Sequence, residues 1–428
     1  MSEQQADLLR HTAEPTSAVY HVMMPLAVPS PRRFRRALAV AGYTHDPLDL
    51  RFYLRYVQGA LEGGAQARIA VLSRTLGEAL TLTYPDGTQA ALSLCHARIF
   101  EFRTGIALFD LVLRGDTAGL ATVADTAAVL RIVDGKGRLV DAAGAELTLL
   151  EIAERLLPEG GYTAFPNMAR GGSPRADVLT SVVTSEAALA GRDRESDLCR
   201  IADTMSASYT VGEAKGIYSP YEYLHWAVTS KGACALAVLN DRQTRRERGF
   251  VHAWHKTVDE RHTLWYAFVL HQRHAMYYYL GGVSGGATSR ELEGYRRKVV
   301  AFNTGYRFEA VSEIPDYQLP YDLAREQKTV ERVFCDADEE IERLNSYRAA
   351  RRDGRTAMAM AVVSIVCLIS TLVDICLLGE AGSLAAFTPL QWALFAVFGA
   401  ATLGALCALV FPVLLSLIAP LLHRPRRK

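Results

Sequence analysis

Two long apolar runs dominate the hydrophobic pattern of this chain, and both lie near its C-terminal end. The first run, residues 356–378, contains a single charged residue, Asp374, and the second, residues 390–422, contains none. A helix needs about 20 apolar residues to cross a hydrocarbon core that is about 30 Å thick. We therefore expect two membrane-spanning helices, joined by an outer loop at residues 379–389, with the body of the protein outside the bilayer.

Basic residues flank this predicted hairpin on both sides, whereas its loop has no lysine or arginine. Four arginines precede the first run, and the tail at residues 423–428 holds three arginines and a lysine. Basic residues favour the cytoplasmic side of a membrane. The pattern predicts a bacterial inner-membrane protein with both ends in the cytoplasm. Residues 1–16 are polar, lack the apolar core of a signal peptide and are expected to be disordered.

Residues 17–245 combine β-rich runs with short amphipathic helical patterns, which predicts a cytosolic α/β domain. Pro85-Asp86-Gly87 separates two extended runs and is typical of a hairpin turn. The expected strands cover residues 18–27, 79–94, 97–113, 177–184 and 227–239. The expected helices cover residues 47–61, 149–157 and 197–208.

Beyond this domain the pattern becomes helical. Residues 246–320 predict a helical hairpin with a glycine-rich turn, and residues 321–355 predict a stalk helix that continues into the first apolar run. Apolar stalk residues recur at heptad-like spacing, which indicates helices packed side by side. The partner of this stripe is either a second copy of the chain or the protein's own body. The stripe consists of Leu323, Val330, Phe334, Ala337, Ile341 and Leu344.

Polar and small side chains share one face of the first apolar run. Polar residues within a membrane normally face a protein interior or water, so this face predicts an oligomer in which the first spans line a pore. Asp374 would attract cations at the pore mouth, and the alternative is an aspartate that reaches water at the helix end. The predicted pore-lining residues are Met360, Ser364, Cys367, Thr371 and Asp374.

This order of elements resembles the CorA family of divalent-cation channels, and the resemblance covers residues 246–428. It implies a funnel of five copies, with the first spans around the pore and a basic tail in the cytoplasm. In that family a Gly-Met-Asn motif closes the outer end of the first span. Here Gly379 matches the glycine of the motif and Glu380 follows it at the outer mouth, but the Met and the Asn are absent. Selectivity for magnesium is therefore not implied.

Two groups of polar residues are candidate ligand sites. One face of the helix predicted at residues 246–280 carries donors that suit a divalent cation, with a solvated polar face as the alternative. These donors are His252, His255, Asp259 and His262. A cluster of arginines suits a small anionic signal such as a nucleotide phosphate, with a solvated basic turn as the alternative. This cluster is Arg242, Arg245, Arg246 and Arg248.

The balance of 47 basic and 46 acidic residues argues against a nucleic-acid-binding body. No nucleophile motif, catalytic triad or phosphate-binding loop stands out, so no enzymatic activity is expected. The first hypothesis is a homopentameric cation channel gated by its cytosolic domain. One alternative is a signal- or nucleotide-gated, membrane-permeabilising effector of a bacterial anti-phage defence system. The other is a non-conducting, membrane-anchored sensor or scaffold.

Overall fold

The structure is a computed structural model that divides the chain into two compact units, Met1–Ile341 and Glu342–Lys428. It describes residues 16–46, 48–62, 67–117, 119–135, 138–159, 161–164, 175–239, 250–282, 288–381 and some positions between 388 and 400. Residues 1–15 of the expected disordered segment, the arginine cluster at 242–248, the basic tail and most of the second apolar run lie outside these residues, whereas Thr16 belongs to a strand.

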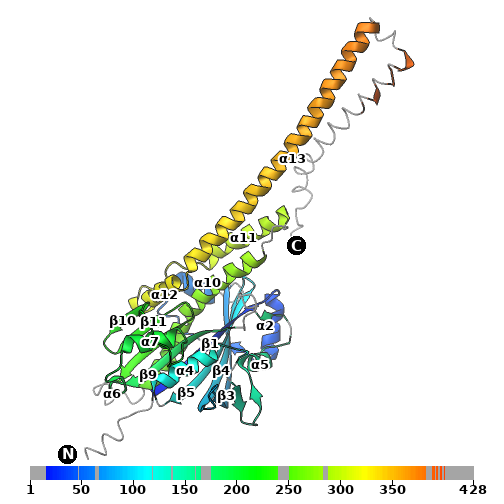
Figure 1. The fold of residues 1–428 in the computed structure, drawn as a ribbon. Helices are drawn as coiled ribbons and strands as arrows, with labels where there is room; N and C mark the ends of the chain where they lie inside the picture. Colours follow the sequence, from blue (N-terminus) through cyan, green and yellow to red (C-terminus); the bar gives the residue numbers. More distant parts are fainter. Residues whose placement is uncertain are drawn as a thin grey trace, which may run out of the picture. The chain divides into compact units, whose positions relative to one another are not determined.

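A twelve-stranded mixed sheet forms the centre of the described part of the first unit (Figure 1). The strands run in the order β10-β11-β12-β9-β1-β5-β4-β3-β6-β7, with β2 paired to β3 and β8 paired to β1. Their bounds are β1 Thr16–Ala27, β2 Thr44–His45, β3 Ile69–Thr83, β4 Gln89–Phe102, β5 Ile106–Thr117, β6 Arg138–Asp141, β7 Glu146–Leu147, β8 Thr163–Ala164, β9 Asp177–Ser185, β10 Ile217–Tyr221, β11 Leu224–Val228 and β12 Gly232–Leu239.

The α/β part of the predicted fold class needs correction, because neighbouring strands are mostly antiparallel. Of the described strand pairs only β9 and β12 are parallel. Long strands that follow each other closely in sequence, such as β3–β4 and β4–β5, pair through tight turns. Parallel pairing needs a crossover of a dozen or more residues, which these connections do not provide. The hairpin predicted around Pro85 is present as the β3–β4 turn.

Helices cover both faces of the sheet. One face packs against α2 Pro31–Val40, α4 Leu120–Leu130, α5 Leu149–Leu156 and α7 Arg194–Ala202, through a core that includes Phe34, Val123, Ile152 and Leu198. The other face packs against α3 Arg55–Glu62, α9 Phe250–Thr257, α10 Thr263–Gly282, α11 Ser289–Gly305 and α12 Pro315–Gln327. The short helix α6, Glu186–Leu189, follows β9. Because side chains alternate along a strand, each strand contributes to both cores.

A five-residue π-helix, η2 Val258–His262, connects α9 to α10. The long helix predicted from residue 246 is therefore present from Phe250 onward, but it is interrupted. A π-turn holds more residues than an α-turn, so it rotates α10 about the helix axis relative to α9. Side chains spaced for one face of an α-helix consequently separate here.

The stalk helix predicted from residue 321 is broken at Lys328 and Thr329. Thr329 has a φ of 53°, in the left-handed region, and α13 Val330–Ala381 begins directly after it. Val330, Phe334 and Ile341 are buried in the core beneath α9 to α12. Up to Ile341, the apolar stripe thus packs onto the protein's own body, as one of its two interpretations predicted.

The prediction of a transmembrane hairpin is wrong for the part of the chain that the structure describes. Its first apolar run is the distal part of α13, a continuous 52-residue helix whose proximal part is rich in charged residues. None of the helices among the described residues has the length and apolar content that a membrane crossing needs. The predicted fold class with two membrane-spanning helices, the inner-membrane localisation and the channel assignment are corrected accordingly.

Gly216 provides a stability test of the β10–β11 edge. Its φ is +72°, and an added Cβ atom would lie 2.2 Å from the Val228 carbonyl oxygen. We expect Gly216→Ala to lower the free energy of unfolding, measured by urea denaturation, by about 3 kcal/mol. Gly191→Ala is the control, because Gly191 has a φ of +74° with nothing within 4 Å. An equal effect of both substitutions would contradict the close approach at Val228.

Candidate anion-binding pocket

The N-terminal end of α2 forms one side of a basic pocket. Pro31 occupies the first turn, and the Ser30 side chain makes no capping hydrogen bond. The first turn also contains no acidic residue, so no side-chain carboxylate within it offsets the partial positive charge of the helix end. Backbone amides at such a position attract anions.

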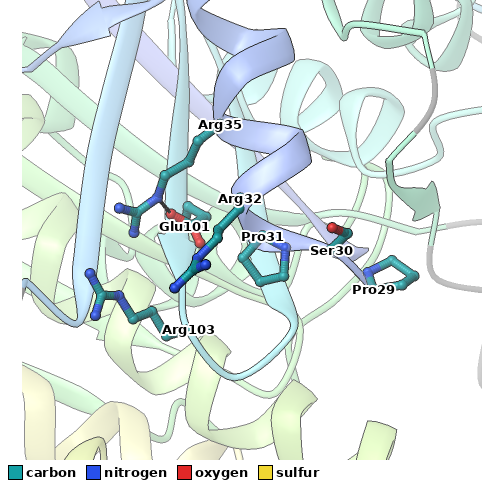
Figure 2. Close-up of a pocket in the computed structure, with 7 residues that line it drawn as sticks. All are labelled: Pro29, Ser30, Pro31, Arg32, Arg35, Glu101 and Arg103. Atoms are coloured by element: carbon teal, nitrogen blue, oxygen red, sulfur yellow. Dashed lines mark hydrogen bonds and ion pairs between the residues drawn. The ribbon is translucent and has the colours of Figure 1, made fainter. Parts of the chain in front are cut away.

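The pocket has a volume of about 590 Å³ and carries three arginines (Figure 2). Arg32 and Arg35 come from one face of α2, three residues apart, and Arg103 comes from the turn after β4. In Figure 2 the Arg32 and Arg35 side chains extend from the helix toward Glu101. The complete lining is Pro29, Ser30, Pro31, Arg32, Arg35, Glu101 and Arg103. Three guanidinium groups and one carboxylate give the ionised lining an excess of two positive charges.

Glu101 is the acidic side chain of this lining, and it is fully buried at 0% exposure. One of its carboxylate oxygens, Oε2, accepts a hydrogen bond from Arg35 Nε. Burial raises the pKa of Glu101, although Arg35 and Arg103 act in the opposite direction. The other oxygen, Oε1, and the Arg35 Nη2 atom have no hydrogen-bond partner among the described residues. The pocket therefore combines surplus positive charge with a buried acceptor that has no hydrogen-bond partner among the described residues.

The four predicted metal ligands lie in different surroundings, two of them on α9 and two in η2. His252 is exposed on α9. His255 is buried, and its ring nitrogens lie 2.9 Å from Ser181 Oγ and 3.2 Å from Ser17 Oγ. Within the described part of the chain, no group of three or more His, Cys, Asp or Glu residues is arranged to hold a metal ion.

His262 and Asp259 contact different parts of the core. The His262 ring stacks on Tyr317 at a centroid distance of 4.6 Å, and His262 Nδ1 accepts a hydrogen bond from Trp265 Nε1. Asp259 faces the sheet, where its Oδ1 atom lies 2.9 Å from Arg98 Nη2. Burial alone would raise the pKa of Asp259, but Arg98 and nearby histidines outweigh burial and hold it well below its usual range.

The predicted pore residues lie on α13 in the second unit. Met360, Ser364 and Thr371 are exposed, Cys367 is half-buried, and Thr371 Oγ1 donates a hydrogen bond to the Cys367 carbonyl of its own helix. The side chains of Asp374 and Glu380 lie outside what the structure describes, but the backbone of these two residues and of Gly379 belongs to the last turns of α13. The start of the predicted outer loop is thus helical.

Sequence reasoning missed a buried network of charged residues. It lies on the face of the sheet that packs against η2. Arg98 Nε donates to Asp46 Oδ2 at 2.7 Å, and Asp110 Oδ2 lies 3.2 Å from His21 Nδ1. His96 also joins it, with Nε2 at 3.3 Å from Asp259 Oδ1. The available signal was the presence of charged residues within apolar runs: Arg98 lies in the buried end of β4, and Asp110 lies in the mostly buried strand β5.

The pocket arginines were also missed, although Ser30-Pro31-Arg32-Arg33 follows a buried strand and opens a helix. Comparison with family models, with curated proteins and with solved structures finds no match to this chain. Function is therefore argued from the geometry of the pocket.

Proposed function

We propose that this protein is a receptor for a small anionic ligand that binds in the basic pocket. The observation that carries the proposal is the convergence of Arg32, Arg35 and Arg103 on one cavity at the N-terminal end of α2. Guanidinium groups bind phosphate and carboxylate oxygens through paired, charge-assisted hydrogen bonds. A cavity of about 590 Å³ has room for ligands from inorganic phosphate to a nucleotide.

This proposal retains the ligand-sensing element of the sequence-based hypotheses and leaves out the channel. The arginines at residues 242–248 are a sequence candidate for an anionic signal, with a solvated basic turn as the alternative, whereas the pocket supports an anion at α2. The resemblance to the CorA family, the homopentamer and the role in anti-phage defence stay predictions. A gating or scaffolding output would come after ligand binding, so ligand binding can be tested without it.

Removing one pocket arginine should weaken anion binding. We expect Arg32→Ala to reduce the affinity of the full chain for inorganic phosphate, pyrophosphate and ATP by about tenfold or more, because a hydrogen bond to a charged group contributes about 1.5–3 kcal/mol. Isothermal titration calorimetry measures each affinity. Binding should also weaken as salt rises, since the attraction is electrostatic.

Arg33→Ala is the matched control. Arg33 is exposed on the same helix, carries the same charge and does not line the pocket. We expect this substitution to change the affinity by less than about threefold. Wild-type protein that binds none of the three anions would overturn the proposed function. Equal losses in both variants would show that the anion contacts the helix surface instead of the pocket.

A further inference from the structure

Glu101 is an unexpected residue in a pocket for anions. It is fully buried, and its Oε1 atom has no hydrogen-bond partner among the described residues. A buried acceptor without a partner loses about 1–3 kcal/mol relative to one that is hydrogen bonded. A carboxylate beside a bound anion adds electrostatic repulsion as well. A ligand that donates a hydrogen bond to Oε1 would remove the cost of the unpaired acceptor. The same hydrogen bond would offset the repulsion between the carboxylate and the anion.

The position of Glu101 is fixed by the sheet. It lies near the end of β4 and pairs with Ala70 of β3 and Ala107 of β5. Its neighbours Phe100 and Phe102 belong to the core on the opposite face of the sheet. Because side chains alternate along a strand, Glu101 faces α2, where Arg35 holds its Oε2 atom. Oε1 is left without a hydrogen-bond partner among the described residues, and Glu101 belongs to the lining of the pocket.

The chemistry of Oε1 distinguishes two anions of the same shape. An ionised carboxylate only accepts hydrogen bonds. Hydrogen phosphate and protonated phosphomonoesters carry a P–OH group that can donate to it, whereas sulfate at neutral pH has no proton to donate. Sites built around a hydrogen bond to a ligand strongly reject analogues that lack the bonding group.

We infer that Glu101 is a specificity-determining residue, through which the basic pocket selects a phosphate-bearing ligand with a P–OH donor over sulfate. The inference rests on the proposed anion-binding function and names the ligand class of the same site. The arginines supply attraction that both anions share, and Glu101 supplies the discrimination. Among the described residues, the charged or titratable groups around Glu101 include Arg32 and Arg35 of α2, Arg103 and the nearby Tyr306.

The pH dependence of sulfate binding gives an internal check. Burial raises the pKa of Glu101, so its carboxyl group takes up a proton at a higher pH than an ordinary glutamate. A protonated carboxyl group can donate to a sulfate oxygen and no longer repels it. Sulfate affinity should therefore rise as pH falls through the raised pKa, while sulfate itself keeps its charge.

Competitive titration of the full chain with inorganic phosphate and sulfate at pH 6.5 tests the inference. We expect phosphate to bind about 100-fold more tightly than sulfate. In Glu101→Gln, whose carboxamide can donate to either anion, the ratio should fall to about threefold or less. The ratio is the readout, because this substitution also frees Arg35 and should raise both affinities.

The outcomes separate the inference from the proposed function. If neither phosphate nor any larger phosphate-bearing anion binds, the receptor proposal itself fails. If phosphate and sulfate bind equally well to the wild type, the receptor stands and the role of Glu101 is overturned. If Glu101→Gln does not fold, the wild-type sulfate titration from pH 7 to pH 4.5 decides, and an affinity that does not rise would overturn the inference.

Discussion

Replacement of Arg98 by methionine is expected to lower the free energy of unfolding by about 3–5 kcal/mol. Arg98 is 2% exposed, and its guanidinium group bonds to Asp46 and lies 2.9 Å from an Asp259 oxygen. Its Nη1 atom lies 3.9 Å from Asp110 Oδ2. Burial lowers the pKa of Arg98, but these three carboxylates outweigh burial and raise it above its ordinary value. Without the guanidinium they would repel one another in the core.

Urea denaturation measures this loss, and Arg138→Met is the control. Arg138 pairs with Glu146 at 3.0 Å, but both side chains are largely exposed, so its removal should cost less than about 1 kcal/mol. The double variant Arg98→Met with Asp259→Asn should be less destabilised than the sum of the single variants, since it removes one of the unpaired charges. A loss below about 1 kcal/mol for Arg98→Met alone would show that the network does not stabilise the fold.

Acidification is expected to destabilise the fold from about pH 6.5 downward, through two buried histidines. Burial lowers the pKa of His255 and of His262 to about 3 each. As the pH falls below about 6.5, the unfolded chain takes up protons at these positions while the folded chain does not. Their contribution to stability is complete above pH 6.5 and is lost progressively toward pH 3. Each histidine should lower the free energy of unfolding by up to about 1.4 kcal/mol per pH unit in this window.

Urea denaturation between pH 7 and pH 4.5 measures this slope. His262→Phe keeps an aromatic ring against Tyr317, and it should reduce the slope even though it leaves the Trp265 N–H unpaired. His252→Phe is the control on the adjoining helix α9, because His252 is exposed, and it should change the slope much less than His262→Phe does. A slope that His262→Phe does not alter would mean that this ring is protonated or solvated in the folded state.

Local elements were predictable where one short-range rule determines them. The turn around Pro85-Asp86-Gly87 and the short helix beginning after Thr148 follow from turn and capping preferences, and both are present. The break at Thr329 was not predictable, because the stretch from residue 321 to residue 353 contains neither Gly nor Pro. Tertiary contacts override helix propensity at that position. The order of the strands in the sheet could not be predicted from the sequence either, because hydrophobic periodicity does not determine which strands pair.

The candidate site was harder to predict than the fold, because its parts come from segments far apart in sequence. Arg35 and Glu101 are 66 positions apart and meet only once β4 lies beneath α2. The residues of the metal prediction lie differently from what was expected for another reason. That prediction assumed α-helical spacing from His252 to His262, and the π-turn at 258–262 changes that spacing. Nothing in the residue types of that segment signals a π-turn.

The bend at Thr329 depends on side chains far from it in sequence. A β-branched residue in the left-handed region costs about 1–3 kcal/mol, which surrounding interactions must offset. Lys328 Nζ, which is buried, bonds to Asp177 of β9 at 2.6 Å, and Arg325 pairs with Glu331 across the bend. A design that transfers α12 and α13 to another scaffold would therefore also need to include strand β9.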